Sequence, residues 1–201
     1  MRYPARRLFA LVSIALFWAC DSPQDQDSAS EAQSAEESPA TPEILPQPFT
    51  AEEIRDEWIE GFQLHMSRRS NDSEERERWT VVSWSEEGAE IEYVSLDEEG
   101  QATGEPRVEP TTWTALRDHA TFPAANASRE SATRDTALGT LKGWIYTVTD
   151  PDQGTVTEFF FAEELPGAPV EFRMLADDEV VMEMLQVERF RPSEDASEPA
   201  S

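Results

Sequence analysis

Apolar residues after about residue 49 begin with a helical period. Thr50–Glu53 has the spacing of a capping box, and Ile54 and Trp58 follow it one helical turn apart. We therefore expect a short helix that begins after Thr50 and ends at Gly61, a residue type that favours helix ends. A second short helix is expected over 112–119, in the middle of the same domain.

Elsewhere apolar and polar residues alternate with a period of two, which is typical of strands with one packed face. Polar turns separate the alternating runs at intervals of roughly 8–12 residues, which favours an antiparallel meander. Strands are expected over 62–66, 79–84, 91–95, 104–108, 141–148, 156–162, 170–175 and 180–187. The sequence thus predicts an α+β domain: a predominantly antiparallel, curved β-sheet with one N-terminal and one mid-domain short helix.

The strand expected over 156–162 has large apolar side chains on both faces near its end. Phe159 and Phe161 share one face, and Phe160 lies on the other. Such a strand is either a central strand covered by a helix or the wall of a hydrophobic cleft. In the second case a small hydrophobic ligand would be lined by Trp144, Phe159, Phe161, Met182 and Met184. In the first case the same side chains fill the core.

Residues 1–19 have the pattern of an export signal. Basic residues precede an apolar run from Leu8 to Trp18, which is too short for a spanning helix of about 20 residues. Ala19 and then Cys20, the single cysteine of the chain, follow the run. This order resembles the lipobox of bacterial lipoproteins, although Phe17 and the bulky Trp18 depart from the usual residues. An ordinary signal peptide with an incidental cysteine is the alternative.

The lipoprotein resemblance implies that the chain is cleaved before Cys20 and that Cys20 carries a diacylglyceryl group and an N-acyl chain such as palmitate. Stable anchoring needs more than one acyl chain, and this modification supplies it. Asp21 resembles an inner-membrane retention signal, but whether the inner or the outer membrane holds the protein stays open.

Composition divides the rest of the chain. Residues 20–49 are rich in Ser, Gln, Glu, Asp and Pro and are expected to form a disordered acidic spacer after the lipidated cysteine. A single β-rich domain is expected over 50–190, and a disordered tail over 191–201. The net charge of −26 argues against nucleic acid as a partner, because binding a polyphosphate requires a basic surface.

Residue types that carry chemistry are scattered rather than grouped. His65 and His119 have no companion at metal-ligand spacing, and neither a Gly-x-Ser-x-Gly elbow nor a glycine-rich phosphate loop occurs. Acidic pairs that could act in a carboxylate hydrolase are Glu98–Glu99, Glu163–Glu164 and Asp177–Asp178, all at expected turns. Asp150–Gly154 begins like a calcium loop but lacks the closing glutamate, so it is interpreted as a hairpin turn. We therefore expect no catalytic, cofactor or metal site.

The stretches 139–148 and 159–170, the latter with its Leu165-Pro166-Gly167 break, resemble β-sheet domains of exported bacterial proteins. More loosely, the pattern resembles curved-sheet periplasmic carriers of lipid or lipoprotein acyl chains. The first hypothesis is a lipid-anchored, non-enzymatic module of the bacterial cell envelope, which faces the periplasm or the cell surface and has an unidentified protein partner or none. The alternatives are a carrier of a small hydrophobic ligand and a carboxylate-based hydrolase.

Overall fold

The computed structural model describes residues 42–70 and 73–192. The export signal, Cys20, most of the expected spacer and most of the expected tail lie outside these residues. The elements are α1 (Ala51–Glu57), β1 (Gln63–Ser70), β2 (Ser73–Trp84), β3 (Gly88–Leu96), β4 (Ala102–Thr112), α2 (Trp113–Asp118), β5 (Ala127–Thr136), β6 (Gly139–Asp150), β7 (Thr155–Ala162), β8 (Glu171–Ala176) and β9 (Glu179–Phe190). All of them belong to one compact unit that begins after Pro39.

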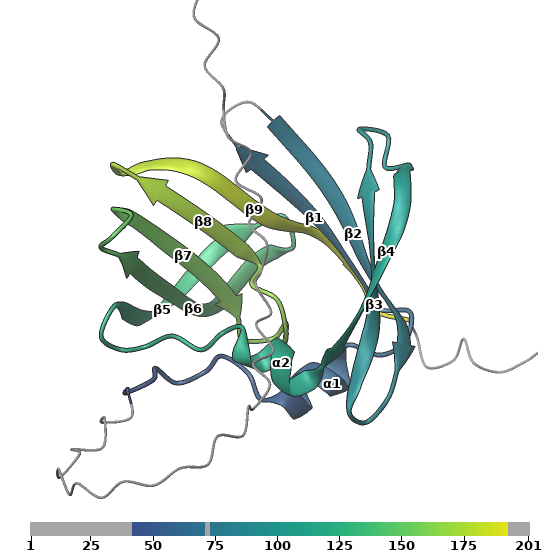
Figure 1. The fold of residues 1–201 in the computed structure, drawn as a ribbon, viewed down its shortest axis with the longest axis horizontal. Helices are drawn as coiled ribbons and strands as arrows, with labels where there is room; N and C mark the ends of the chain where they lie inside the picture. The colour runs from purple at the N-terminus through teal and green to yellow at the C-terminus, as the bar shows by residue number, and fades with distance from the viewer. Residues whose placement is uncertain (1–41, 71–72, 193–201) are drawn as a thin grey trace, which may run out of the picture. The chain divides into compact units, whose positions relative to one another are not determined.

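In the described part of the chain, all nine strands form one sheet in the order β4-β3-β2-β1-β9-β8-β7-β6-β5. Every neighbouring pair is antiparallel, so two meanders, β1–β4 and β5–β9, are joined where β1 pairs with β9. Figure 1 shows that the sheet is strongly curved, with α1 and α2 across one end. The predicted α+β fold with a curved antiparallel sheet is confirmed.

The first helix starts where the sequence predicts and ends earlier. The Glu53 amide donates to Thr50 Oγ1 at 3.1 Å, and the Thr50 amide donates to Glu53 Oε2 at 2.7 Å, which completes the capping box. The expected end at Gly61 was wrong, because α1 stops at Glu57 and Trp58 is its C-cap. The Trp58 indole turns inward to donate to the Pro166 carbonyl at 2.9 Å, so tertiary packing ends the helix.

The sheet contains one strand that the sequence did not predict. Residues 127–136 form β5, at one edge of the sheet, in a stretch for which the sequence predicted no helix or strand. An edge strand is solvated on one side, and β5 has few apolar residues to mark its alternation. β4, at the other edge, extends beyond the expected 104–108. Its residues are also mostly exposed, so their pattern did not mark the full length of the strand.

Two layers of apolar side chains cover the sheet. The larger cluster lies on the face toward the helices, which we call the concave face, and includes Ile54, Trp58, Leu64, Tyr146 and Phe161. A smaller cluster lies on the opposite, convex face and consists of Leu141, Ile145, Phe160, Ala162 and Val170. β7 contributes to both clusters, so its two apolar faces mark a central strand.

None of the helices in the described ranges is long and apolar enough to cross a membrane.

Candidate functional site: the concave face of the sheet

The concave face gathers the methionines of the domain. Met184 is the cross-strand partner of Phe172, and Met182 is the partner of Met174. Met66 follows buried Leu64 by two residues on β1, so it points to the same side. All four methionines that follow Met1 therefore lie on this one face, contributed by β1, β8 and β9.

The five residues that the sequence singled out as a possible ligand lining also lie on the concave face. Trp144 is the cross-strand partner of Phe161, and Phe159 is the partner of Phe172. Phe161 is buried in the core under Phe49, with ring centroids 6.2 Å apart. The other four, which include Met182 and Met184, are only partly buried.

Sequence reasoning missed further residues of this face, namely Met66, Trp79, Tyr93, Phe172 and Met174. The period-two rule, extended along the strand expected over 170–175, would have found Phe172 and Met174. It could not have placed Trp79 and Tyr93 on the same sheet face as Met182 and Met184, because that depends on the pairing of β1 with β9, which joins the two meanders. Their rings lie 5.3 Å apart across β2 and β3.

The part of the concave face next to the helices is filled. Phe122, in the segment that follows α2, packs against Tyr146 and Phe159 with centroids 4.8 and 5.0 Å away. Tyr146 is completely buried, and its hydroxyl donates to the Pro46 carbonyl at 2.5 Å. The protein's own side chains therefore pack against this end of the concave face.

Farther from the helices the face is partly open. Phe172, Met174, Met182 and Met184 retain exposed surface there. A hollow of about 370 Å³ adjoins Met184 and is lined also by Met66, Leu96 and charged and polar side chains of β1 to β4. An apolar strip of the sheet thus borders water without a cover among the described residues.

Charged groups flank this strip on the β1–β4 side. Arg68 and Glu75 form an ion pair, and the Arg107 guanidinium lies 4.4 Å from the centre of the Tyr93 ring. Burial raises the pKa of Tyr93, and the negative charge of Glu109 raises it further. Tyr93 is therefore a neutral amphipathic side chain at neutral pH. The concave face is therefore mainly apolar over β7–β9, whereas over β1–β4 it carries both apolar and charged side chains.

Buried charge supports the same face at the helix end. Arg189 on β9 donates to Glu57 Oε1 of α1 at 3.0 Å and to the Pro166 carbonyl at 2.9 Å. Burial lowers the pKa of Arg189, and the contact with Glu57 opposes that effect. The pair ties the end of α1 to the sheet.

The groups considered for catalysis or metal binding lie elsewhere. His65 Nδ1 is 3.0 Å from Glu188 Oε2 at the surface, and His119 caps the end of α2. The three acidic pairs are exposed in turns. Within the described ranges, no three His, Cys, Asp or Glu side chains are grouped to hold a metal ion.

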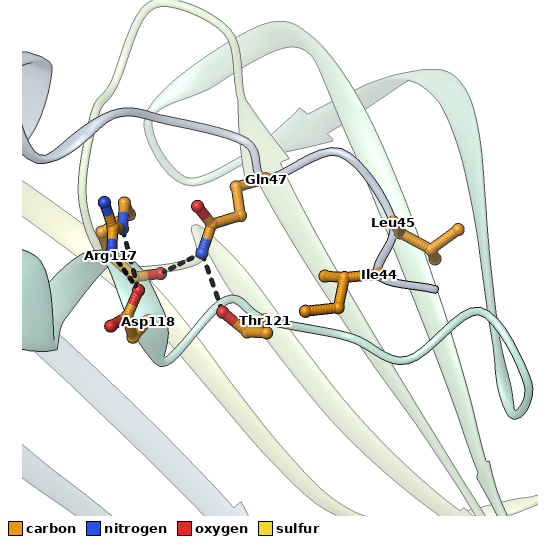
Figure 2. A pocket seen from close by; sticks show the side chains of 6 residues that line it. All are labelled: Ile44, Leu45, Gln47, Arg117, Asp118 and Thr121. Atoms are coloured by element: carbon orange, nitrogen blue, oxygen red, sulfur yellow. Dashed lines mark hydrogen bonds and ion pairs between the residues drawn. The ribbon is translucent and has the colours of Figure 1, made fainter. Parts of the chain in front are cut away.

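Another hollow lies between the segment 44–47 and the end of α2. It measures about 670 Å³ and is lined by Ile44, Leu45, Gln47, Arg117, Asp118 and Thr121. Figure 2 shows the Gln47 amide directed at the far wall, where it donates to Thr121 Oγ1 at 2.8 Å. Arg117 is paired with its neighbour Asp118. These contacts attach the N-terminal segment to α2, which is a structural role.

Comparison with known proteins gives distant fold matches. No family model and no curated protein matches the chain. Among solved structures, the crystal structure of MucB is 15% identical, with a TM-score of 0.49, over 74% of this chain and 60% of MucB. The Pseudomonas aeruginosa MucA/MucB complex gives 17% identity and a TM-score of 0.49, over 75% of this chain and 58% of that one.

A third structure, the hypothetical protein CT021 from Chlamydia trachomatis, is 13% identical with a TM-score of 0.40. It is matched over 76% of this chain and 98% of its own. This chain spans less than two thirds of the MucB chains that it matches.

Proposed function

We propose that this protein is a lipid-anchored module of the bacterial cell envelope that binds an apolar ligand on the open part of its concave sheet face. The observation that carries the binding role is the placement of four methionines and several aromatic rings on one partly exposed face. The anchoring role rests on the leader and on Cys20.

Methionine suits a surface that accepts apolar chains of varied shape. Its unbranched, polarisable side chain adapts to irregular partners, and surfaces that bind several ligands use it for that reason. Met174, Met182 and Met184 lie together across β8 and β9, and Phe172 and Phe159 continue the strip toward β7. A flexible acyl chain or another narrow apolar ligand fits such a strip better than a rigid, highly polar one.

Partial exposure separates this strip from an ordinary core. Side chains that only fill the interior are covered, as Phe161 and Tyr146 are. Exposed apolar patches bordered by polar groups commonly mark binding sites. The charged pairs on β1 to β4 give the strip such a border, and they would keep the polar end of an amphipathic ligand in water.

The test uses the soluble chain from Asp21 onward, which contains the whole compact unit. Its binding of the neutral probe 1-decanol is measured by isothermal titration and by native mass spectrometry. We expect saturable binding that the double substitution Met182→Gln, Met184→Gln weakens about tenfold, since two apolar contacts are replaced by polar groups.

The matched control is Leu185→Gln, on the same strand but on the convex face, where Leu185 is the partner of Glu171. It should leave probe binding unchanged. Absence of saturable binding by the native chain, or equal binding by the double variant, would refute the proposed ligand role.

A further inference from the structure

β5 is an edge strand without the features that usually stop edge pairing. The opposite edge strand, β4, contains Gly104 with a positive φ, Pro106 and Pro110, and its register shifts against β3. Proline removes a backbone donor and a bulge distorts the edge, so β4 is a poor template. β5 contains neither glycine nor proline and pairs with β6 without a register shift. Within the described residues its other side pairs with no strand.

The direction of the free backbone groups on β5 follows from its pairing with β6. The Asn126 carbonyl accepts from the Thr149 amide at 2.9 Å, so the even-numbered residues point their backbone groups toward β6. Because these groups alternate along an antiparallel strand, Arg129, Ser131, Thr133 and Asp135 point theirs away from the sheet. A further strand would bond to these residues.

Arg129 on this strand differs from the other arginines of the domain. Twelve arginines lie between residues 55 and 191, and eleven of them come within 4.0 Å of a carboxylate oxygen. In the described structure Arg129 makes no such pair. Its guanidinium instead lies over two aromatic rings, 4.5 Å from the centre of the Trp144 ring and 5.6 Å from that of Tyr146. In a chain with 42 acidic residues, this points to an acceptor supplied from outside the domain.

A second copy of β5 would present a matching acceptor. In an antiparallel pair with its two-fold axis at Ala132, Arg129 of one molecule faces Asp135 of the other, and Glu130 faces Arg134. Both Arg129 and Asp135 point their backbone groups outward. The same register therefore pairs these backbone groups by hydrogen bonds and brings the opposite charges together. Shifting the register by two residues in either direction places Arg129 opposite Thr133 or Ala137 and removes both ion pairs.

We propose that the protein forms a homodimer through antiparallel pairing of β5 with β5 in this register. The sheet then continues from one molecule into the next, with the two concave faces on the same side. The Arg129–Asp135 pair occurs twice by symmetry. Asp135 is exposed and has one oxygen engaged by Thr140, at 2.6 Å, which leaves the other for Arg129.

The test is sedimentation equilibrium of the chain from Asp21 onward, at about 0.15 M ionic strength, where the Debye length of about 8 Å screens net charge more than contact pairs. We expect a concentration-dependent dimer. Arg129→Asp and Asp135→Arg should each raise the dissociation constant at least about tenfold, because like charges then face each other twice. The double swap should restore dimerisation, since each pair is rebuilt in reverse.

Arg107→Asp on β4 is the matched control, because Arg107 is also on an edge strand and its guanidinium also lies over an aromatic ring, that of Tyr93 on the neighbouring strand β3. It should leave the dimer unchanged, and circular dichroism melting checks that every variant is folded. A native chain that stays monomeric, single variants that dimerise normally, or a folded double variant that stays monomeric would each overturn the proposal.

Discussion

At the scale of single residues, the tryptophans combine burial with a specific polar contact. The indole N–H of Trp58 donates to the Pro166 carbonyl and that of Trp113 to the Ser85 carbonyl, each at 2.9 Å. The Trp84 indole reaches the Arg55 carbonyl at 3.4 Å. Buried indoles need such acceptors, so each of these three tryptophans connects two segments of the chain that are distant in sequence. The sequence identifies the tryptophans as core residues, but it does not identify their partners.

Gly167 allows one of these contacts by close approach. Its φ is +116°, and a Cβ at this position would lie 2.4 Å from Nε1 of Trp58. We expect Gly167→Ala to destabilise the protein by about 3 kcal/mol, since backbone strain adds to the displacement of a buried ring. Urea unfolding followed by tryptophan fluorescence measures the change.

Gly139→Ala is the control for backbone strain alone. Gly139 has nearly the same φ, +114°, and no atom lies within 4 Å of the position that a Cβ would take there. The expected cost is about 1–2 kcal/mol. Equal losses for the two variants would show that the Trp58 contact does not restrict position 167.

At the scale of elements, turns set the register of the strands. Asp177 and Asp178 join β8 to β9 with φ values of 52° and 63°, the pattern of a type I′ turn. Positive φ is unfavourable for residues with a Cβ, and aspartate tolerates it better than most. Asp177 and Asp178, which were considered as a catalytic pair, thus form the two-residue turn of a tight hairpin.

Replacement of the second turn residue should relieve this strain. We expect Asp178→Gly to stabilise the protein by about 0.5–1 kcal/mol, because glycine adopts positive φ without a Cβ penalty. Thermal and urea unfolding at neutral pH provide the measurement.

Glu99→Gly, in the turn between β3 and β4, is the comparison. Glu99 does not have a positive φ, so glycine there only adds chain entropy to the unfolded state and should cost about 0.5–1 kcal/mol. A destabilised Asp178→Gly variant would argue against strain at this turn.

Element prediction from the sequence succeeded where one face of a strand or helix is apolar. β1, β3, β6 and β7 were found from period-two alternation, and the start of α1 from its capping box. It failed for β5 because an edge strand with mostly polar residues has no such alternation. It also failed for the end of α1, where Trp58 leaves the helix to meet Pro166.

At the scale of the whole molecule, the acidic surface and the anchor belong together in the proposed function. The net charge of the whole chain, −26, favours solubility and opposes electrostatic binding to anionic lipids. In the proposed function, acyl chains on Cys20 would therefore provide the membrane attachment.

Metabolic labelling tests the anchor. Cells that make the full chain and grow with labelled palmitate should incorporate label into the protein, and Cys20→Ser should abolish the label and release the protein from membranes. Ser22→Ala, two residues away, should behave like the native chain. An unlabelled native protein, or a Cys20→Ser protein that stays membrane-bound, would exclude lipid anchoring through this cysteine.

The sequence by itself determined the class of fold and the residues that share a strand face, because alternation and helix capping are local properties of the chain. It could also name Trp144, Phe159, Phe161, Met182 and Met184 as members of one apolar set. Only the tertiary structure decided that Phe161 is covered by Phe49 while Met182 and Met184 stay partly open. It also decided that β1 pairs with β9, which leaves β5 at an edge with Arg129 lacking a carboxylate. Burial and strand neighbours depend on contacts between residues that are distant in sequence, and a local pattern does not encode them.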